Sequence, residues 1–72
     1  MLSDEIKDAV KCHIHGLNNA TIVFQDLLTG DFDYRQIFSN SYIECKKWIT
    51  DNSFFYDSND IPYSSYLNGE LI

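Results

Sequence analysis

Hydrophobic and polar residues alternate with a period of two along residues 20–38, in two runs. Both runs are rich in β-branched and aromatic side chains, which suit half-buried strands. In the first run, Ile22 and Phe24 fall on one face of an extended chain, and Thr21 and Val23 fall on the other. This alternation predicts a β-strand.

A turn and a second strand follow. Gly30 can adopt the positive φ that a tight turn needs. The second run places Phe32 and Tyr34 opposite two charged residues, and its period slips near Gln36, which predicts a bulge or the end of the strand there. We therefore expect a β-hairpin over residues 20–38.

The period then changes, and residues 41–52 are predicted to form a helix. Ser41 and Glu44 have the spacing of a capping box, in which each side chain binds the other residue's backbone N–H. The helix contains Trp48, the only tryptophan. Its predicted apolar face consists of Ile43, Cys45, Trp48 and Ile49.

The N-terminal segment is expected to form a helix over residues 3–16. Ser3 is a suitable N-cap, and Gly16 lies where such a helix would end. A strand over residues 10–15 is the alternative, since apolar and polar side chains also alternate there. The residues that recur at helical steps are Ile6, Ala9, Val10, His13 and Leu17.

The last segment, residues 53–72, is expected to form a partly ordered strap or tail. Phe54 and Phe55 are expected to close the core. Asp60 as an N-cap and Gly69 as a stop allow one short helix between them.

The length of 72 residues corresponds to one small α+β domain, residues 1–72. Its formal net charge of −6 argues against direct nucleic-acid binding and against an anionic membrane as a partner. The N-terminus lacks the features of a signal peptide, and no apolar run has the length of a membrane span. With only two cysteines, the chain is expected to be cytoplasmic with both thiols reduced.

Four residues have side chains that bind zinc or act as nucleophile and base in thiol enzymes. They lack the paired spacing of a zinc site, and the cysteines also fit as small buried side chains. A thiol enzyme would also need an orienting group and an oxyanion pocket, for which no motif is present. We therefore expect no metal, no cofactor and no catalysis. The four residues are Cys12, His13, His15 and Cys45.

Acidic and aromatic residues dominate the C-terminal segment, which contains no basic residue from Asp51 onward. The charge can serve solubility alone, or it can form an acidic face that mimics nucleic-acid phosphates towards a basic groove. Tyrosines are frequent anchors in protein interfaces. The predicted partner-binding residues are Asp51, Asp57, Asp60, Tyr63, Tyr66 and Glu70.

Part of the chain resembles small accessory proteins of tailed phages. In those proteins a strand, a Thr-Gly turn, a second strand and a Ser-x-x-Glu-Cys-x-x-Trp helix form a ββα unit. The resemblance implies a phage or prophage origin and a protein that binds and inhibits a host factor, as host-takeover, anti-restriction and anti-CRISPR proteins do. The matching residues are 21–24, 28–31, 41–49 and 51–52.

These observations predict a non-enzymatic acidic protein that blocks a host protein by occupying a basic surface, including one that binds nucleic acid. Negative charge would steer the encounter, and tyrosines would prolong the complex. The alternative is a structural or assembly protein that self-associates, as a homodimer or larger, through its aromatic C-terminal segment.

Overall fold

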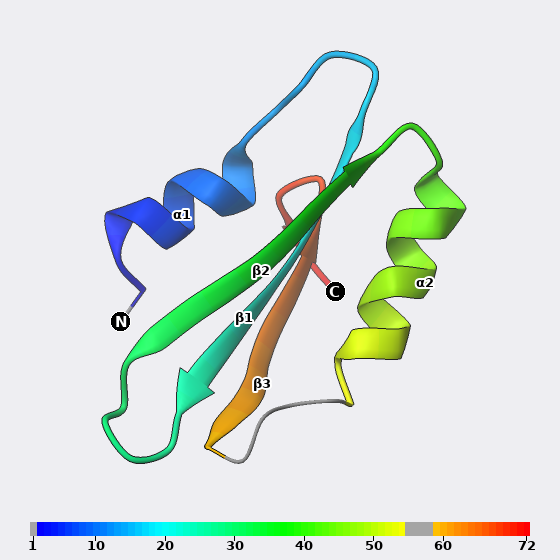
Figure 1. Cartoon of the computed structure of the whole chain (residues 1–72). Coiled ribbons are helices and arrows are strands. Elements are labelled where there is room, and N and C mark those ends of the chain that lie inside the picture. Colours follow the sequence, from blue (N-terminus) through cyan, green and yellow to red (C-terminus); the bar gives the residue numbers. More distant parts are fainter. Residues whose placement is uncertain (1, 55–58) are drawn as a thin grey trace.

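An antiparallel sheet lies between two helices in the computed structural model, which describes residues 2–54 and 59–72 (Figure 1). The strands formed by these residues follow the order β2-β1-β3-β4. The combination of helices with this antiparallel sheet confirms the predicted α+β fold. No helix within the described ranges has the length and apolar character needed to cross a bilayer. The elements are α1 (Asp4–Lys11), β1 (Asn18–Asp26), β2 (Phe32–Ser39), α2 (Tyr42–Asn52), β3 (Asp60–Leu67) and β4 (Glu70–Leu71).

β1 is the central strand and is buried on both faces. The predicted alternation is confirmed: Ile22 and Phe24 face α2, whereas Val23 faces α1. Ile22 and Val23 are both fully buried. The apolar run of β1 therefore serves two cores, one under each helix (Figure 1).

Each helix covers one face of the sheet with a few side chains. On one face, Ile6 and Val10 of α1 pack on Val23, with Leu2, Phe32, Tyr34 and Tyr66 around them. On the other face, Cys45 and Ile49 of α2 pack on β1 and on Leu67 of β3. The partly buried residues around this second core are Ile37 and Trp48.

The predicted helix over residues 41–52 is confirmed, and its N-cap is Ser41. The Ser41 hydroxyl accepts a hydrogen bond from the Glu44 N–H at 3.1 Å. The other half of the expected capping box is indirect, because Ser39 Oγ accepts from the Ser41 N–H and donates to the Glu44 carboxylate. Ile43 is 78% exposed, so its assignment to the apolar face was wrong.

The hairpin is confirmed as β1 and β2, but the bulge expected near Gln36 is wrong. β2 pairs with β1 in continuous register through the pair of Thr21 and Gln36. Gln36 interrupts the apolar pattern while facing inward, because its amide hydrogen-bonds inside the protein. The irregularity lies in β3 instead, where Tyr63 is the extra residue opposite Val23 and Phe24.

The N-terminal helix is shorter than the predicted range 3–16. α1 ends at Lys11, and Cys12 is already extended. Gly16 does adopt a positive φ of 80°, but it does so in a later turn where the Leu17 N–H donates to the Ile14 carbonyl. The alternative strand over residues 10–15 is not formed either.

The C-terminal segment differs most from its prediction. β3 replaces the expected short helix, and Asp60 begins this strand rather than capping a helix. β3 pairs with β1 along its length and so completes the centre of the sheet. Phe54 is 80% exposed, which contradicts its expected place in the core, and Phe55 lies outside the described residues.

Candidate functional site

Asn19 joins the C-terminal end of α1 to the sheet. Its side-chain amide donates to the carbonyls of Ala9, Val10 and Cys12, at 3.0, 3.2 and 2.9 Å. Carbonyls at a helix C-terminus have no partner within the helix, so a side chain that satisfies them stabilises the end. Asn19, a residue of β1, therefore caps the C-terminal end of α1.

Thr21 and Gln36 extend this polar cluster across two strands. The Thr21 hydroxyl donates to Asn19 Oδ1 at 2.7 Å, and the Gln36 amide donates to Asn19, Thr21 and the Ala9 carbonyl. Among the described residues, every buried side-chain nitrogen and oxygen has a hydrogen-bond partner. The cluster is thus fully satisfied, which suits a structural role.

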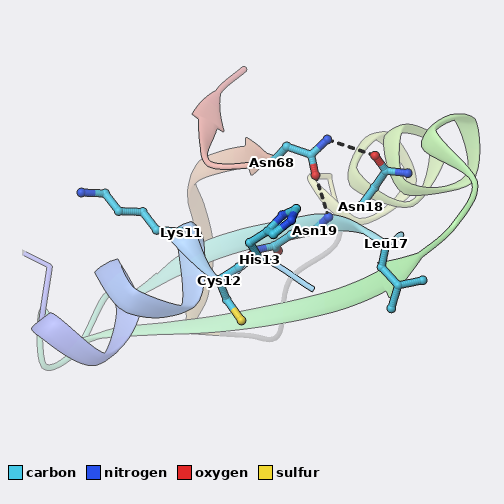
Figure 2. Close-up of a pocket in the computed structure, with 7 residues that line it drawn as sticks. All are labelled: Lys11, Cys12, His13, Leu17, Asn18, Asn19 and Asn68. Carbon is cyan, nitrogen blue, oxygen red and sulfur yellow. Dashed lines mark hydrogen bonds between the residues drawn. The ribbon is translucent and has the colours of Figure 1, made fainter. Parts of the chain in front are cut away.

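A cavity of about 250 Å³ lies beside this cluster (Figure 2). Figure 2 shows Asn68 between Asn18 and the Asn19 backbone, bonded to both, and Lys11 directed away from these amides. The volume is below the roughly 300–1,000 Å³ typical of small-molecule pockets. The lining residues are Lys11, Cys12, His13, Leu17, Asn18, Asn19 and Asn68.

The residues considered for zinc or thiol chemistry are separated. Cys12 is exposed beside the cavity, whereas Cys45 is buried on the α2 side of the sheet. Burial raises the pKa of the Cys45 thiol, and its sulfur lies 3.6 Å from the Asn18 carbonyl. No group of three potential metal ligands gathers within residues 2–54 and 59–72.

The β1–β2 turn exposes apolar side chains at the opposite end of the sheet. Leu27 and Leu28 are 61% and 78% exposed. The Asp26 carboxylate accepts from the backbone N–H groups of Leu28 and Thr29, at 2.7 and 3.2 Å, which fixes the turn. The two leucines therefore project from an ordered backbone.

Acidic residues lie next to these leucines in the chain and in the sheet register. Asp26 lies directly opposite Asp60 in the β1–β3 register, and the Asp26 N–H donates to the Asp31 carbonyl. The Leu27 N–H donates to the Asn59 carbonyl, which holds the start of β3 against the turn. We call residues 26–31 together with Asp60 the hairpin tip.

The sequence around the hairpin tip carries only negative charge. The end of α2 is directed towards this same end of the sheet (Figure 1). Residues 26–34 and 51–60 contain six of the eleven acidic residues and no Lys, Arg or His. Along the sequence, the net negative charge is thus concentrated in these two segments.

The predicted partner-binding residues occupy several parts of the fold. Asp60 belongs to the hairpin tip, and the exposed Asp51 lies in the last turn of α2. Tyr63 is 57% exposed and packs edge-on against Phe32, with ring centroids 4.7 Å apart.

Tyr66 is half-buried on the α1 side, and its hydroxyl oxygen accepts a hydrogen bond from Ser64 Oγ at 3.2 Å. Glu70 is exposed in β4, beyond the turn at the far end of β3. Asp57 lies outside the described residues. Of the predicted acids that the structure describes, Asp60 alone lies directly beside the β1–β2 turn.

Sequence reasoning missed Leu27, Leu28 and Asp26 as a possible contact surface. The available signal was two consecutive leucines in a segment otherwise read as a turn, because exposed apolar neighbours are unusual in a loop.

Comparison with known proteins places the chain in no family. No family model matches its sequence, and neither the curated proteins nor the solved structures include a significant match.

Proposed function

We propose that this protein is a non-enzymatic cytoplasmic binding protein that blocks a basic surface of a host protein with its hairpin tip. The observation that carries the proposal is the exposed pair Leu27 and Leu28 in a turn whose neighbouring residues include Asp26, Asp31 and Asp60. Apolar side chains in such a setting are typical of interaction surfaces.

The two kinds of side chain have different parts in binding. Carboxylates accelerate the encounter with a basic partner, and this effect weakens as salt is added. Leucines that enter an apolar depression lose contact with water, which slows dissociation. The hairpin tip would therefore supply both the attraction and the anchor.

The cost of this arrangement to the fold also supports the proposal. Asp26 and Asp60 are directly opposite each other in the sheet, where like charges are destabilising. Two exposed leucines add no stability to the isolated chain. A basic partner with an apolar depression would relieve both penalties.

The resemblance to phage accessory proteins suggests the class of partner. We propose a host defence protein whose basic surface binds nucleic acid, so that the hairpin tip competes with phosphates. Binding would be stoichiometric, as in an anti-restriction or anti-CRISPR inhibitor. The exposed Asp51 and Tyr63 would lie at the margin of the contact.

The test is affinity capture from nuclease-treated bacterial lysate with the tagged wild type and with the variant Leu27→Ser/Leu28→Ser. We expect one stoichiometric partner for the wild type, and binding of the purified partner weakened about tenfold or more in the variant. Added salt should weaken the wild-type complex.

Ile43→Ser is the matched control, because Ile43 is as exposed as Leu28 but lies on α2. It should bind the partner like the wild type. Equal binding by the leucine variant, or binding that salt does not change, would contradict the proposed surface.

A further inference from the structure

β2 is an edge strand with one side of its backbone unpaired. Its residues from Phe32 to Ser39 pair with β1, and no described strand lies on its other side. The Asp26 N–H donates to the Asp31 carbonyl, so Asp31 turns its carbonyl towards β1, while its own N–H donates to Thr29 Oγ1. The residues that alternate with it in β2 therefore direct their backbone groups outward: Phe32, Tyr34, Gln36 and Phe38.

The opposite side of the sheet is protected against strand addition, whereas β2 is not. β4 has only two residues, and β3 contains Pro62 and the bulge at Tyr63. Short edge strands, prolines and bulges are the usual devices that prevent edges from pairing. β2 has eight residues, continuous register and no proline.

The charges of β2 are complementary to those of a second, antiparallel β2. Asp33 and Arg35 are exposed and lie on the same face of the strand. If a two-fold axis passes between two copies of Tyr34, Asp33 of each copy lies opposite Arg35 of the other. Directly opposite charges of unlike sign stabilise an antiparallel pair, and shifting the axis to Arg35 would place like charges together.

We infer that two copies of this chain associate through antiparallel pairing of their β2 strands, centred on Tyr34. The two Tyr34 residues then exchange backbone hydrogen bonds, and Phe32 of each copy bonds to Gln36 of the other. The two sheets become one continuous sheet. This interface replaces the C-terminal segment as the expected route of self-association.

Pairing would exchange existing interactions for new ones. In the single chain, the Asp33 carboxylate accepts from the outward Tyr34 N–H at 2.8 Å. In the dimer the Tyr34 carbonyl of the other copy takes this N–H, and Asp33 turns to Arg35 of that copy. The Arg35 guanidinium, 5.2 Å from the centroid of the Phe24 ring, is already held near this face.

The first test is the mass of the protein in solution over a range of concentrations, by sedimentation equilibrium. We expect twice the chain mass at high concentration and a return to the single chain on dilution. Asp33→Arg should give a single chain, and Asp33→Arg/Arg35→Asp should restore the dimer because the opposed charges are exchanged. Asp51→Arg, an equal change of charge on α2, should leave the dimer unchanged.

The second test fixes the register by cross-linking in a Cys12→Ser background. Opposed residues of a hydrogen-bonded antiparallel pair have Cα atoms about 5.5 Å apart, within the range of a disulfide. Tyr34→Cys should therefore form a disulfide-linked dimer on mild oxidation. Phe38→Cys has the same orientation but lies away from the axis, and it should form no disulfide-linked dimer.

A single-chain mass for the wild type at every concentration would overturn the inference. A dimer that persists in Asp33→Arg, or that the double reversal does not restore, would also overturn it. Equal cross-linking through Phe38→Cys would overturn the register. Circular dichroism of each variant separates loss of the interface from loss of the fold.

Discussion

Asn19 ends α1 with its side chain, although the sequence offers Gly16 five residues beyond α1. Its amide donates to two carbonyls of the last turn and to the carbonyl of Cys12, while its backbone belongs to β1. The side-chain oxygen accepts from Thr21 and Gln36. One residue therefore joins a helix terminus, the central strand and the edge strand.

Replacing Asn19 with alanine should destabilise the fold. The carbonyls of Val10 and Cys12 lose the Asn19 donor, and Thr21 and Gln36 lose an acceptor, so we expect the free energy of unfolding to fall by about 1–3 kcal/mol. Urea denaturation followed by circular dichroism measures this change. Asn40→Ala, at an exposed position, is the control and should change stability little. An Asn19 variant as stable as this control would refute the capping role.

Gln36 shows why the polar cluster was not predicted from sequence. A glutamine among apolar and aromatic neighbours was interpreted as a break in the strand. It faces inward because its partners, Asn19 and the Ala9 carbonyl, come from segments 17 and 27 residues away in the chain. A local pattern contains no information on partners at such separations.

At the scale of elements, α2 begins through two linked serines. Ser41 caps the helix directly, and Ser39 connects the Ser41 N–H to the Glu44 carboxylate. The last residue of β2 thus takes part in starting the next element. The sequence predicted this helix well because the cap and the apolar spacing are both local.

Ser41→Ala should weaken this start. Loss of an N-cap hydroxyl costs about 0.5–2 kcal/mol, so the urea midpoint should fall accordingly. Ser39→Ala removes only the hydroxyl that links the Ser41 N–H to the Glu44 carboxylate, and it should have a smaller effect. Lys47→Ala, on the exposed side of α2, should be close to wild type. A larger loss from Ser39→Ala than from Ser41→Ala would contradict this order of importance.

β3 could not be predicted in the same way. Asp60, Pro62 and Gly69 are placed as they would be in a short capped helix, so the local signals indicated the wrong element. The strand forms because β1 offers unpaired backbone groups and Leu67 fills the core beneath α2. Pro62 is accommodated next to the bulge, where a regular ladder is already interrupted.

At the scale of the whole molecule, two small cores share one strand. Neither helix touches the other core, yet Ile22 and Val23 are neighbours in β1 and face opposite helices. A loss of packing on one face must therefore also disturb β1, which carries the core on the other face. We expect the two cores to unfold together.

Val10→Ala tests this coupling. The substitution removes packing under α1, whereas Trp48 reports on the α2 side. We expect a loss of about 0.5–3 kcal/mol, with the same shift in midpoint by Trp48 fluorescence and by circular dichroism. Glu5→Ala, at an exposed position of α1, is the control. Separate midpoints for the two signals would show that the cores unfold independently.

The sequence predicted the negative charge of the hairpin tip but not its exposed leucines. The excess of acidic residues is visible in the sequence, and Asp60 was among the predicted contacts. The meeting of Asp60 with Asp26 and the exposed leucines depends on β3 pairing beside the β1–β2 turn, which no local pattern indicated. The tyrosines were predicted as anchors, but Tyr66 is half-buried against the α1 core.

The central position of β1 has a consequence for synthesis on the ribosome. The nascent chain can form the β1–β2 hairpin and α2 before the residues of β3 emerge, because β3 comes last of the long strands. Until then, β1 presents the backbone groups of Asn19, Thr21, Val23 and Gln25 to the solvent as an unpaired edge. Slow codons between α2 and β3 would lengthen this interval, in which chaperones or neighbouring nascent chains can capture the strand.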